Sequence, residues 1–146
     1  MSDFLEVIRE ARRQGDPALL CRAIPYAAFL GLTAELREGR CVSVLTYDDA
    51  LIGNPLLPAL HGGTIGALLE SAAIFQVCWD IDLAVTPKTI TFTVDYLRSG
   101  RPVDTYARAT IARQGRRVAA VQVEAWQEDP SRPIAVALGH LRIQPA

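Results

Sequence analysis

Cysteine and histidine are scarce in this sequence, and their scarcity excludes several kinds of site. The 146 residues include three cysteines, Cys21, Cys41 and Cys78, and two histidines. The cysteines are odd in number and far apart, so they form no Cys-x-x-Cys clip, and no spacing typical of metal ligands occurs. We therefore expect buried free thiols in a reducing compartment, the cytoplasm, and neither a metal ion nor a redox cofactor.

Long apolar runs and an excess of one charge are also missing. No segment approaches about 18 consecutive apolar residues, and Asp3 and Glu6 lie where a signal peptide would be apolar, so the sequence predicts neither a membrane span nor a secreted protein. Fifteen Lys and Arg against sixteen Asp and Glu give a net charge of −1, which does not favour nucleic acid or a membrane as a partner. The motifs of α/β-hydrolases, P-loops and dinucleotide-binding folds are absent too.

The sequence does contain the apolar pattern of an α+β protein. Half of the residues are hydrophobic and 21% are charged, which is typical of a globular domain. The pattern predicts a helix over residues 3–13, a short helix from Asp16 that Pro25 ends, a β-hairpin over 32–46 and a loop over 48–61. The rest of the chain is predicted to be a long apolar helix and a four-strand meander, over residues 62–79, 90–96, 103–111, 118–123 and 133–143.

This order of elements predicts how the domain packs. The long helix is apolar on nearly every side, which indicates that it is buried, and the short connections between strands indicate an antiparallel sheet. We expect residues 1–146 to form one domain in which a curved sheet of about five to six strands wraps around that helix, with short helices at the N-terminus. A sheet covers only part of such a helix, so we expect a second copy of the chain to cover the rest.

Glu70 is the one carboxylate within the long apolar helix. Its neighbours on the helix surface include Gly63, Gly66, Ala67 and Ala73, whose small size leaves room for a ligand or a closely approaching backbone. A buried carboxylate destabilises a fold unless it is partnered or serves a site. Two interpretations stay open at this point: Glu70 belongs to a functional site, or it forms an ion pair with an arginine from the sheet or from a second chain.

His61-Gly62-Gly63 opens the same helix. The first N–H groups of a helix have no partner within it and carry the positive end of the dipole, so they suit a developing oxyanion. Gly62 and Glu70 are eight residues apart, which is about 12 Å along a helix axis and too far for both to act on one carbonyl. Antiparallel helices in a homodimer would bring Glu70 of one chain to Gly62 of the other.

Three stretches of the sequence resemble hotdog-fold acyl-CoA thioesterases, most closely the phenylacetic acid pathway (PaaI-like) branch. They are Leu60–Ala72, which includes His61-Gly62-Gly63 and Glu70, Ile24–Leu32, and Thr93–Arg98. The resemblance covers about residues 24–143. It implies the hotdog fold, an acyl-CoA substrate, and hydrolysis without a metal or redox cofactor.

The resemblance also implies roles for five residues. The N–H of Gly62 would polarise the thioester carbonyl, and Glu70 of the neighbouring subunit, where this branch usually has Asp, would act as base or nucleophile. Asn54 lies one residue before the position of the family's loop amide. His61 would support this loop, and Thr89 would help to hold water.

A cluster of arginines follows the predicted strand over 90–96. Residues 98–117 hold six arginines and one acid, a local charge of +5. Arg98 follows that strand, and Arg113, Arg116 and Arg117 flank a predicted turn. Because arginine binds phosphate bidentately, we expect some of these four to hold the phosphates of CoA, the alternative being a solvated turn.

The sequence thus predicts an acyl-CoA thioesterase, a homodimer or tetramer with its site at the subunit interface. One alternative is a hotdog protein that binds acyl-CoA without hydrolysing it, against which Glu70 argues. Another is an acyl-ACP dehydratase, which would need a histidine in a His-x-Pro-Gly loop where this chain has Leu56-Leu57-Pro58-Ala59. The identity of the acyl group, and whether CoA or ACP carries it, stay open.

Overall fold

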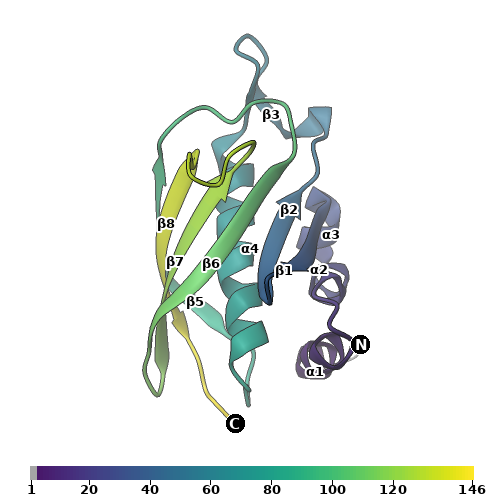
Figure 1. Ribbon diagram of the computed structural model, residues 1–146, viewed down its shortest axis with the longest axis vertical. Coiled ribbons are helices and arrows are strands. Elements are labelled where there is room, and N and C mark those ends of the chain that lie inside the picture. Colours follow the sequence, from purple (N-terminus) through teal and green to yellow (C-terminus); the bar gives the residue numbers. More distant parts are fainter. Residues whose placement is uncertain (1–2) are drawn as a thin grey trace.

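The computed structural model describes residues 3–146, and the chain begins with three short helices (Figure 1). They are α1 (Phe4–Gln14), α2 (Ala18–Ala23) and α3 (Pro25–Leu30). The Asp3 side chain accepts a hydrogen bond from the Leu5 N–H and caps α1, and Gly15, at φ 65°, ends it. Pro25 stands where α2 has ended, as predicted, and it also begins α3, because proline fits the first position of a helix.

The predicted β-hairpin is confirmed as β1 (Leu32–Arg37) and β2 (Arg40–Leu45). Glu38 and Gly39 form its turn, with φ angles of 52° and 75°. Positive φ at both turn positions matches the right-handed twist of the flanking strands. The hairpin can therefore pack as part of a larger twisted sheet.

The segment predicted to be a loop, residues 48–61, contains short regular structure. A 3-10 turn, η1 (Asp49–Leu51), leads into a ribbon of β3 (Ile52–Asn54) and β4 (Ala59–Leu60). The prediction of a plain loop is wrong because Leu51, Ala59 and Leu60 are buried, and backbone groups buried with them need hydrogen-bond partners. One such bond runs from the His61 N–H to the Leu51 carbonyl at 2.8 Å.

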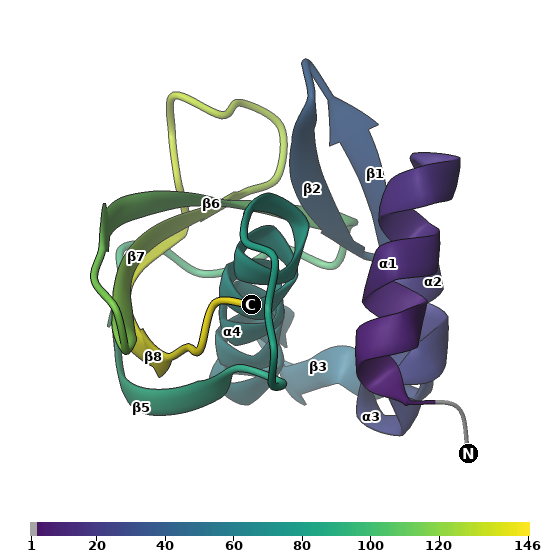
Figure 2. The same ribbon diagram turned by 90° about the horizontal axis from the view of Figure 1, so that it is seen from below.

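A curved six-stranded antiparallel sheet wraps around the central helix α4 (Gly62–Asp80), as predicted (Figures 1 and 2). The strands after α4 are β5 (Lys88–Tyr96), β6 (Thr105–Gln114), β7 (Val118–Trp126) and β8 (Ala135–Arg142). Side chains of α4 such as Leu68, Leu69 and Phe75 are fully buried and belong to one core. Over residues 3–146, no helix is both long and apolar enough to cross a membrane.

The strands after α4 do not form the predicted four-strand meander. The strand order is β1-β2-β6-β7-β8-β5, so β6, β7 and β8 are a meander, whereas β5 pairs with β8 at the sheet edge and β6 pairs with β2. The connection over residues 97–104 is too long for a tight hairpin. It passes the end of β8, where the Leu97 N–H donates to the Ile134 carbonyl. As the last strand of the sheet, β5 keeps one edge without a partner strand in the described chain.

A β-bulge in β5 changes which residues face α4. The register with β8 shifts between Thr89 and Thr91, so Ile90 has no partner there. Alternation along a strand predicts that Ile90 and Phe92 share one face. Phe92 does pack against the core, but Ile90 is 55% exposed, so the prediction is wrong for Ile90. Thr89 takes the inward position instead, opposite the buried Leu141.

Candidate functional site

The first turn of α4 is built around His61. This residue is the N-cap, and its Nδ1 accepts a hydrogen bond of 2.9 Å from the Gly63 N–H. Gly53 of β3 lies so close that a Cβ there would come within 2.7 Å of the His61 Cα, so only glycine permits the approach. No hydrogen bond within residues 3–146 uses the Gly62 N–H. A free donor therefore stands at the positive end of the helix dipole.

Glu70 lies further along α4, half-buried, and its partner is a hydroxyl. Thr89 Oγ1 donates to Glu70 Oε1 at 2.8 Å. The bulge at Ile90 makes this contact, because it turns Thr89 toward the helix. None of the ion pairs found in the described residues includes Glu70, so an arginine of the same chain is not its partner.

Tyr96, at the end of β5, is a residue of this region that the sequence did not single out. Its hydroxyl donates to the Gly62 carbonyl at 2.7 Å. A Cβ at Gly62 would lie 3.4 Å from the Tyr96 ring, and one at Gly66 would lie 3.3 Å from its hydroxyl. Tyr96 therefore fills part of the notch that small residues leave on α4. The sequence signal for it was an aromatic residue at the last inward position of the strand after the helix.

A stripe of α4 stays open in the single chain. Gly63 is exposed, and Ala67, Glu70 and Ile74 are only half-buried, whereas nine of the 19 residues of the helix are buried. Gly62 and Glu70 lie on this one helix and do not meet, being about 12 Å apart along its axis. Chemistry that needs both groups on one carbonyl therefore needs a second chain.

Asn54 lies apart from these groups. It is exposed at the end of β3, and its Oδ1 accepts a hydrogen bond of 3.0 Å from the Leu56 N–H. This is a local turn of the kind that asparagine favours. In the described part of the chain no hydrogen bond joins Asn54 to Gly62 or Glu70, so a single chain does not bring its amide to them.

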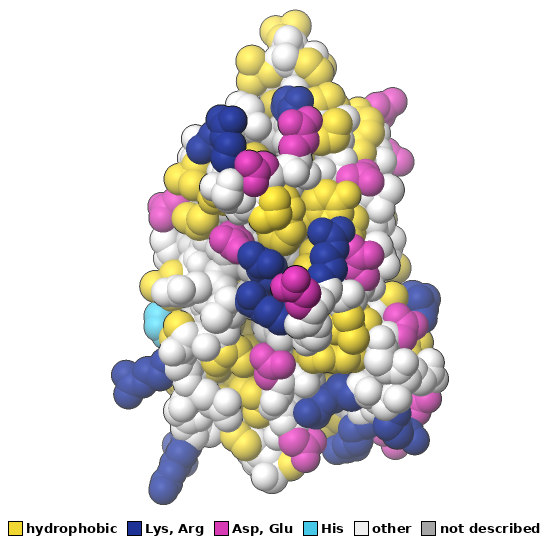
Figure 3. All heavy atoms as spheres, viewed as in Figure 1, with side chains coloured by type: hydrophobic (Ala, Val, Ile, Leu, Met, Phe, Trp, Pro, Cys, Tyr) yellow, Lys and Arg dark blue, Asp and Glu magenta, His cyan; other side chains and the backbone are white. Residues whose placement is uncertain are grey.

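The four arginines predicted to bind phosphate lie in two groups. Arg113, Arg116 and Arg117 line a hollow of about 680 Å³ at the β6–β7 turn, at the lower end of the molecule where cationic side chains project (Figure 3). Arg98 borders a hollow of about 340 Å³ at the start of α4. The two groups lie beside opposite ends of β8, on the order of 20 Å apart. One chain therefore cannot bring all four to one nucleotide.

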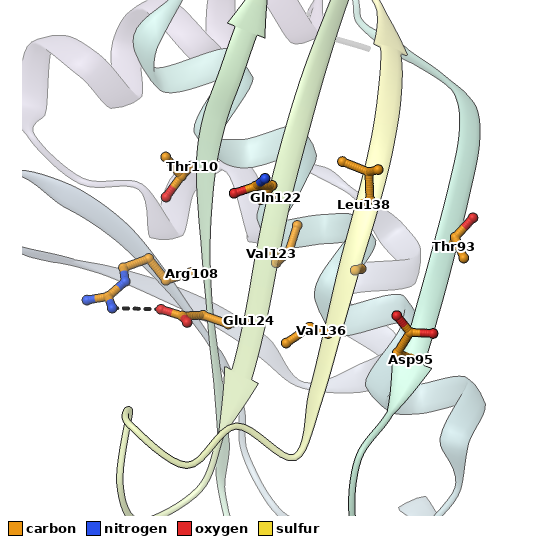
Figure 4. Close-up of a pocket in the computed structure, with 10 residues that line it drawn as sticks. Thr93, Asp95, Arg108, Thr110, Gln122, Val123, Glu124, Val136 and Leu138 are labelled. Carbon is orange, nitrogen blue, oxygen red and sulfur yellow. Dashed lines mark hydrogen bonds and ion pairs between the residues drawn. The ribbon is translucent and has the colours of Figure 1, made fainter.

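A further hollow, of about 540 Å³, lies on the outer face of the sheet (Figure 4). Its lining includes Thr93, Gln122 and the ion pair between Arg108 and Glu124, at 2.8 Å. These side chains alternate along their strands with those that face α4, so they lie on the opposite side of the sheet from Glu70. None of the predicted site residues lines this hollow.

The cysteines do not supply a nucleophile. Burial raises the pKa of the Cys21, Cys41 and Cys78 thiols to about 12, so they are protonated at neutral pH. Across residues 3–146 no three His, Cys, Asp or Glu side chains are grouped so that they could hold a metal ion. The Glu70 carboxylate and the free Gly62 N–H are the groups with evident chemistry.

Comparison with known proteins relates this geometry to a family. Residues 54–141, more than half of the chain, match the acyl-CoA thioesterase N-terminal domain family. No curated protein matches the chain.

Solved structures show the same fold. A protein from Chromobacterium violaceum is 36% identical, with a TM-score of 0.77 over 94% of this chain and 96% of that one. A phenylacetic acid degradation-related protein from Ralstonia eutropha is 23% identical, with a TM-score of 0.73 over 86% and 98%. A Bacillus halodurans protein solved with CoA is 21% identical, with a TM-score of 0.74 over 99% and 93%. The chain is a hotdog-fold protein and belongs to the acyl-CoA thioesterase family.

Proposed function

We propose that this protein hydrolyses acyl-CoA thioesters to a carboxylic acid and CoA, at a site shared by two chains. The observation that carries the proposal is the hydrogen bond from Thr89 to Glu70, because it orients a carboxylate on the open stripe of an otherwise buried helix. Membership of the acyl-CoA thioesterase family supports the same reaction. The CoA held by the Bacillus halodurans protein indicates that this fold can accommodate the substrate's carrier.

In the proposed reaction the Gly62 N–H donates to the thioester carbonyl oxygen and stabilises the negative charge that develops there. Glu70 either takes a proton from a water molecule that attacks the carbonyl carbon, or attacks that carbon itself to give an anhydride that water then hydrolyses. In both routes the C–S bond breaks, the CoA thiolate leaves and takes up a proton, and the water oxygen ends in the acid. Thr89 holds one oxygen of Glu70 and leaves the other for the substrate.

A second copy of the chain supplies the missing half of the site. The open stripe of α4 and the unpaired edge of β5 adjoin each other, and exposed apolar residues of β5, Ile90 and Tyr96, lie beside that edge. A free strand edge with apolar side chains favours pairing with another strand. Two chains joined antiparallel along β5 would place α4 against α4 in opposite directions. Glu70 of one chain then approaches Gly62 of the other.

The same antiparallel arrangement would bring the two groups of arginines close together. It reverses one chain relative to the other, so Arg98 of one chain and the β6–β7 turn of its partner lie at the same end of the dimer. We propose that arginines from both groups hold the phosphates of CoA there, because guanidinium groups bind phosphate bidentately.

Replacement of Glu70 by glutamine tests the proposed function. Glu70→Gln keeps the shape of the side chain and its contact with Thr89 but cannot act as base or nucleophile. We expect kcat for acyl-CoA hydrolysis, measured across aromatic and aliphatic acyl groups, to fall on the order of 10²-fold or more. The matched control is Glu35→Gln on β1, an exposed glutamate paired with Arg37, which should keep normal turnover.

Two outcomes would contradict this. A Glu70→Gln variant with near-normal kcat would show that the carboxylate does no chemistry. A wild-type protein that binds acyl-CoA but hydrolyses none of the panel would favour the non-catalytic alternative.

Loss of the hairpin arginines tests the phosphate contacts. The triple variant Arg113→Ala, Arg116→Ala, Arg117→Ala should raise KM for acyl-CoA at low salt, and the difference from wild type should shrink as salt rises, because salt screens exposed charges. Its control removes the same charge from the N-terminal helices, at Arg9, Arg13 and Arg22. An unchanged KM at low salt, or an equal rise in the control, would favour a solvated turn.

A further inference from the structure

We propose that Tyr96 is a positioning residue that holds the first turn of α4 in the form that presents the Gly62 N–H to the substrate. This inference rests on the proposed function, because it assigns to Gly62 the donor role in thioester hydrolysis. Tyr96 itself need not touch the thioester. It acts through the backbone of Gly62 and Gly63.

The geometry behind the proposal is a continuous chain of hydrogen bonds. The Tyr96 hydroxyl donates to the Gly62 carbonyl at 2.7 Å, and the N–H of the same peptide unit, that of Gly63, donates to His61 Nδ1 at 2.9 Å. A peptide group that accepts a hydrogen bond at its oxygen is polarised and becomes a stronger donor at its nitrogen. Tyr96 therefore strengthens the cap that His61 places on α4.

This chain of bonds fixes two properties of the helix start. His61 Nδ1 accepts from a backbone N–H, so the neutral ring carries its proton on Nε2. The peptide units on both sides of Gly62 are held as well, since the His61 carbonyl accepts hydrogen bonds from the Thr64 N–H and hydroxyl, and Tyr96 holds the Gly62 carbonyl. The Gly62 N–H lies between these two fixed points and is left without a partner in the described residues. A donor fixed in advance stabilises an oxyanion without reorganising during the reaction.

The placement of Tyr96 is more specific than packing requires. Its side chain is 54% exposed, so it contributes little to the core. Its hydroxyl lies in a notch beside Gly66, where a Cβ would come within 3.3 Å of it, whereas a Cβ at Gly62 would make an ordinary contact with the ring at 3.4 Å. The same strand carries Thr89 at its other end, on Glu70. β5 thus sets both halves of the proposed site with hydroxyl groups, Tyr96 on the donor and Thr89 on the carboxylate.

Tyr96→Phe tests the proposal because it removes the hydroxyl and keeps the ring. We expect kcat to fall about tenfold, a smaller loss than removal of an oxyanion donor itself would cause, with KM and Tm nearly unchanged. The Gly63 amide proton should move upfield in NMR spectra, because its bond to His61 weakens. Tyr47→Phe is the control: it also removes a hydroxyl bonded within the chain, to Asp49, and should change neither kcat nor the Gly63 signal.

Gly66→Ala perturbs the contact of the Tyr96 hydroxyl with α4 from the side of the helix. Its Cβ would lie 3.3 Å from the Tyr96 hydroxyl, so the hydroxyl must shift by a few tenths of an ångström and its bond to the Gly62 carbonyl is strained, whereas alanine favours a helix more than glycine does. We expect a protein at least as stable as wild type with the lowered kcat and the shifted Gly63 signal of Tyr96→Phe. A purely structural role for Tyr96 would not separate activity from stability in this way.

The outcomes separate this inference from the proposed function. A wild-type protein without thioesterase activity would refute the proposed function, while the Gly63 signal would still report whether Tyr96 fixes the helix start. An active protein whose Tyr96→Phe variant keeps wild-type kcat would overturn the positioning role and leave the proposed function intact. An unshifted Gly63 amide in that variant would also overturn it.

Discussion

At the scale of single residues, three buried thiols are expected to make the fold less stable as the pH becomes alkaline. Burial raises the pKa of Cys21, Cys41 and Cys78 from 9.0 to about 12. Unfolding exposes them, so their pKa returns to its ordinary value. Between pH 9 and pH 12 the unfolded chain has lost protons that the folded chain still holds. Unfolding therefore becomes more favourable as pH rises through this range.

We expect the free energy of unfolding contributed by these thiols to be fully present below pH 9 and to decline above it. The decline should approach about 1.4 kcal/mol per pH unit for each thiol. Denaturant unfolding at a series of pH values measures it. The control is the triple variant Cys21→Ala, Cys41→Ala, Cys78→Ala, which should be less stable at neutral pH but lose less stability at high pH. Equal slopes in the two proteins would show that the thiols are not protected by burial.

Residues of the site differ in how far the sequence reveals them. Glu70 is evident because it is the one charge in the apolar helix predicted over residues 62–79, and Thr89 follows from the resemblance to the family. Tyr96 is not evident, because its acceptor is a backbone carbonyl 34 positions away. No local pattern of residue types records a hydrogen bond to a distant main-chain atom.

At the scale of elements, strand β5 shows what periodicity predicts and what it misses. Alternating apolar residues place the strand and identify Phe92 as an inward residue. They do not predict the bulge, because the one residue that it adds to the strand is of no distinctive type. A shift of one residue reverses which side chains face inward, and here it exchanges Ile90 for Thr89 at the position beside Glu70.

Local sequence patterns also do not predict the strand order or the shortest strands. Consecutive strands often pair, which predicts β5 beside β6, but pairing with β8 depends on contacts far apart in the sequence. β3 and β4 are too short for a periodicity to appear, and Pro55 and Pro58 between them are typical of loops. By contrast, the long helix α4 was predicted to within one residue, because its apolar pattern is long and unbroken.

At the scale of the whole molecule, the sheet of a single chain leaves part of α4 uncovered. The sheet curves around one side of α4 and ends at β5 (Figure 2). The stripe of α4 that carries Glu70 lies beside this free edge and is only half-buried. The small residues Gly63 and Ala67 on the stripe permit another helix to approach closely. The molar mass of the wild-type protein, measured by sedimentation, should therefore be at least twice the chain mass of 15.9 kDa.

Two inactive variants should restore activity to each other if the site is shared between chains. Glu70→Gln removes the carboxylate. Gly62→Pro removes the N–H donor and fits the fold, because proline is favoured at the first helical position and the preceding residue, His61, is already extended at ψ 128°. A mixed dimer then holds one site with both groups intact, formed by Gly62 of one chain and Glu70 of the other.

Co-expression of the two variants measures this directly. Random pairing gives mixed dimers in half of the molecules with one working site of two, so we expect about a quarter of wild-type kcat per site. The control pairs Glu70→Gln with the double variant Gly62→Pro, Glu70→Gln, which restores no carboxylate and should stay inactive. Absence of recovery in verified mixed dimers would show that Gly62 and Glu70 do not act on one substrate across the interface. In a twofold-symmetric dimer, recovery would require the two α4 helices to run antiparallel, because parallel helices related by a twofold axis stay in register and keep the start of one away from the middle of the other.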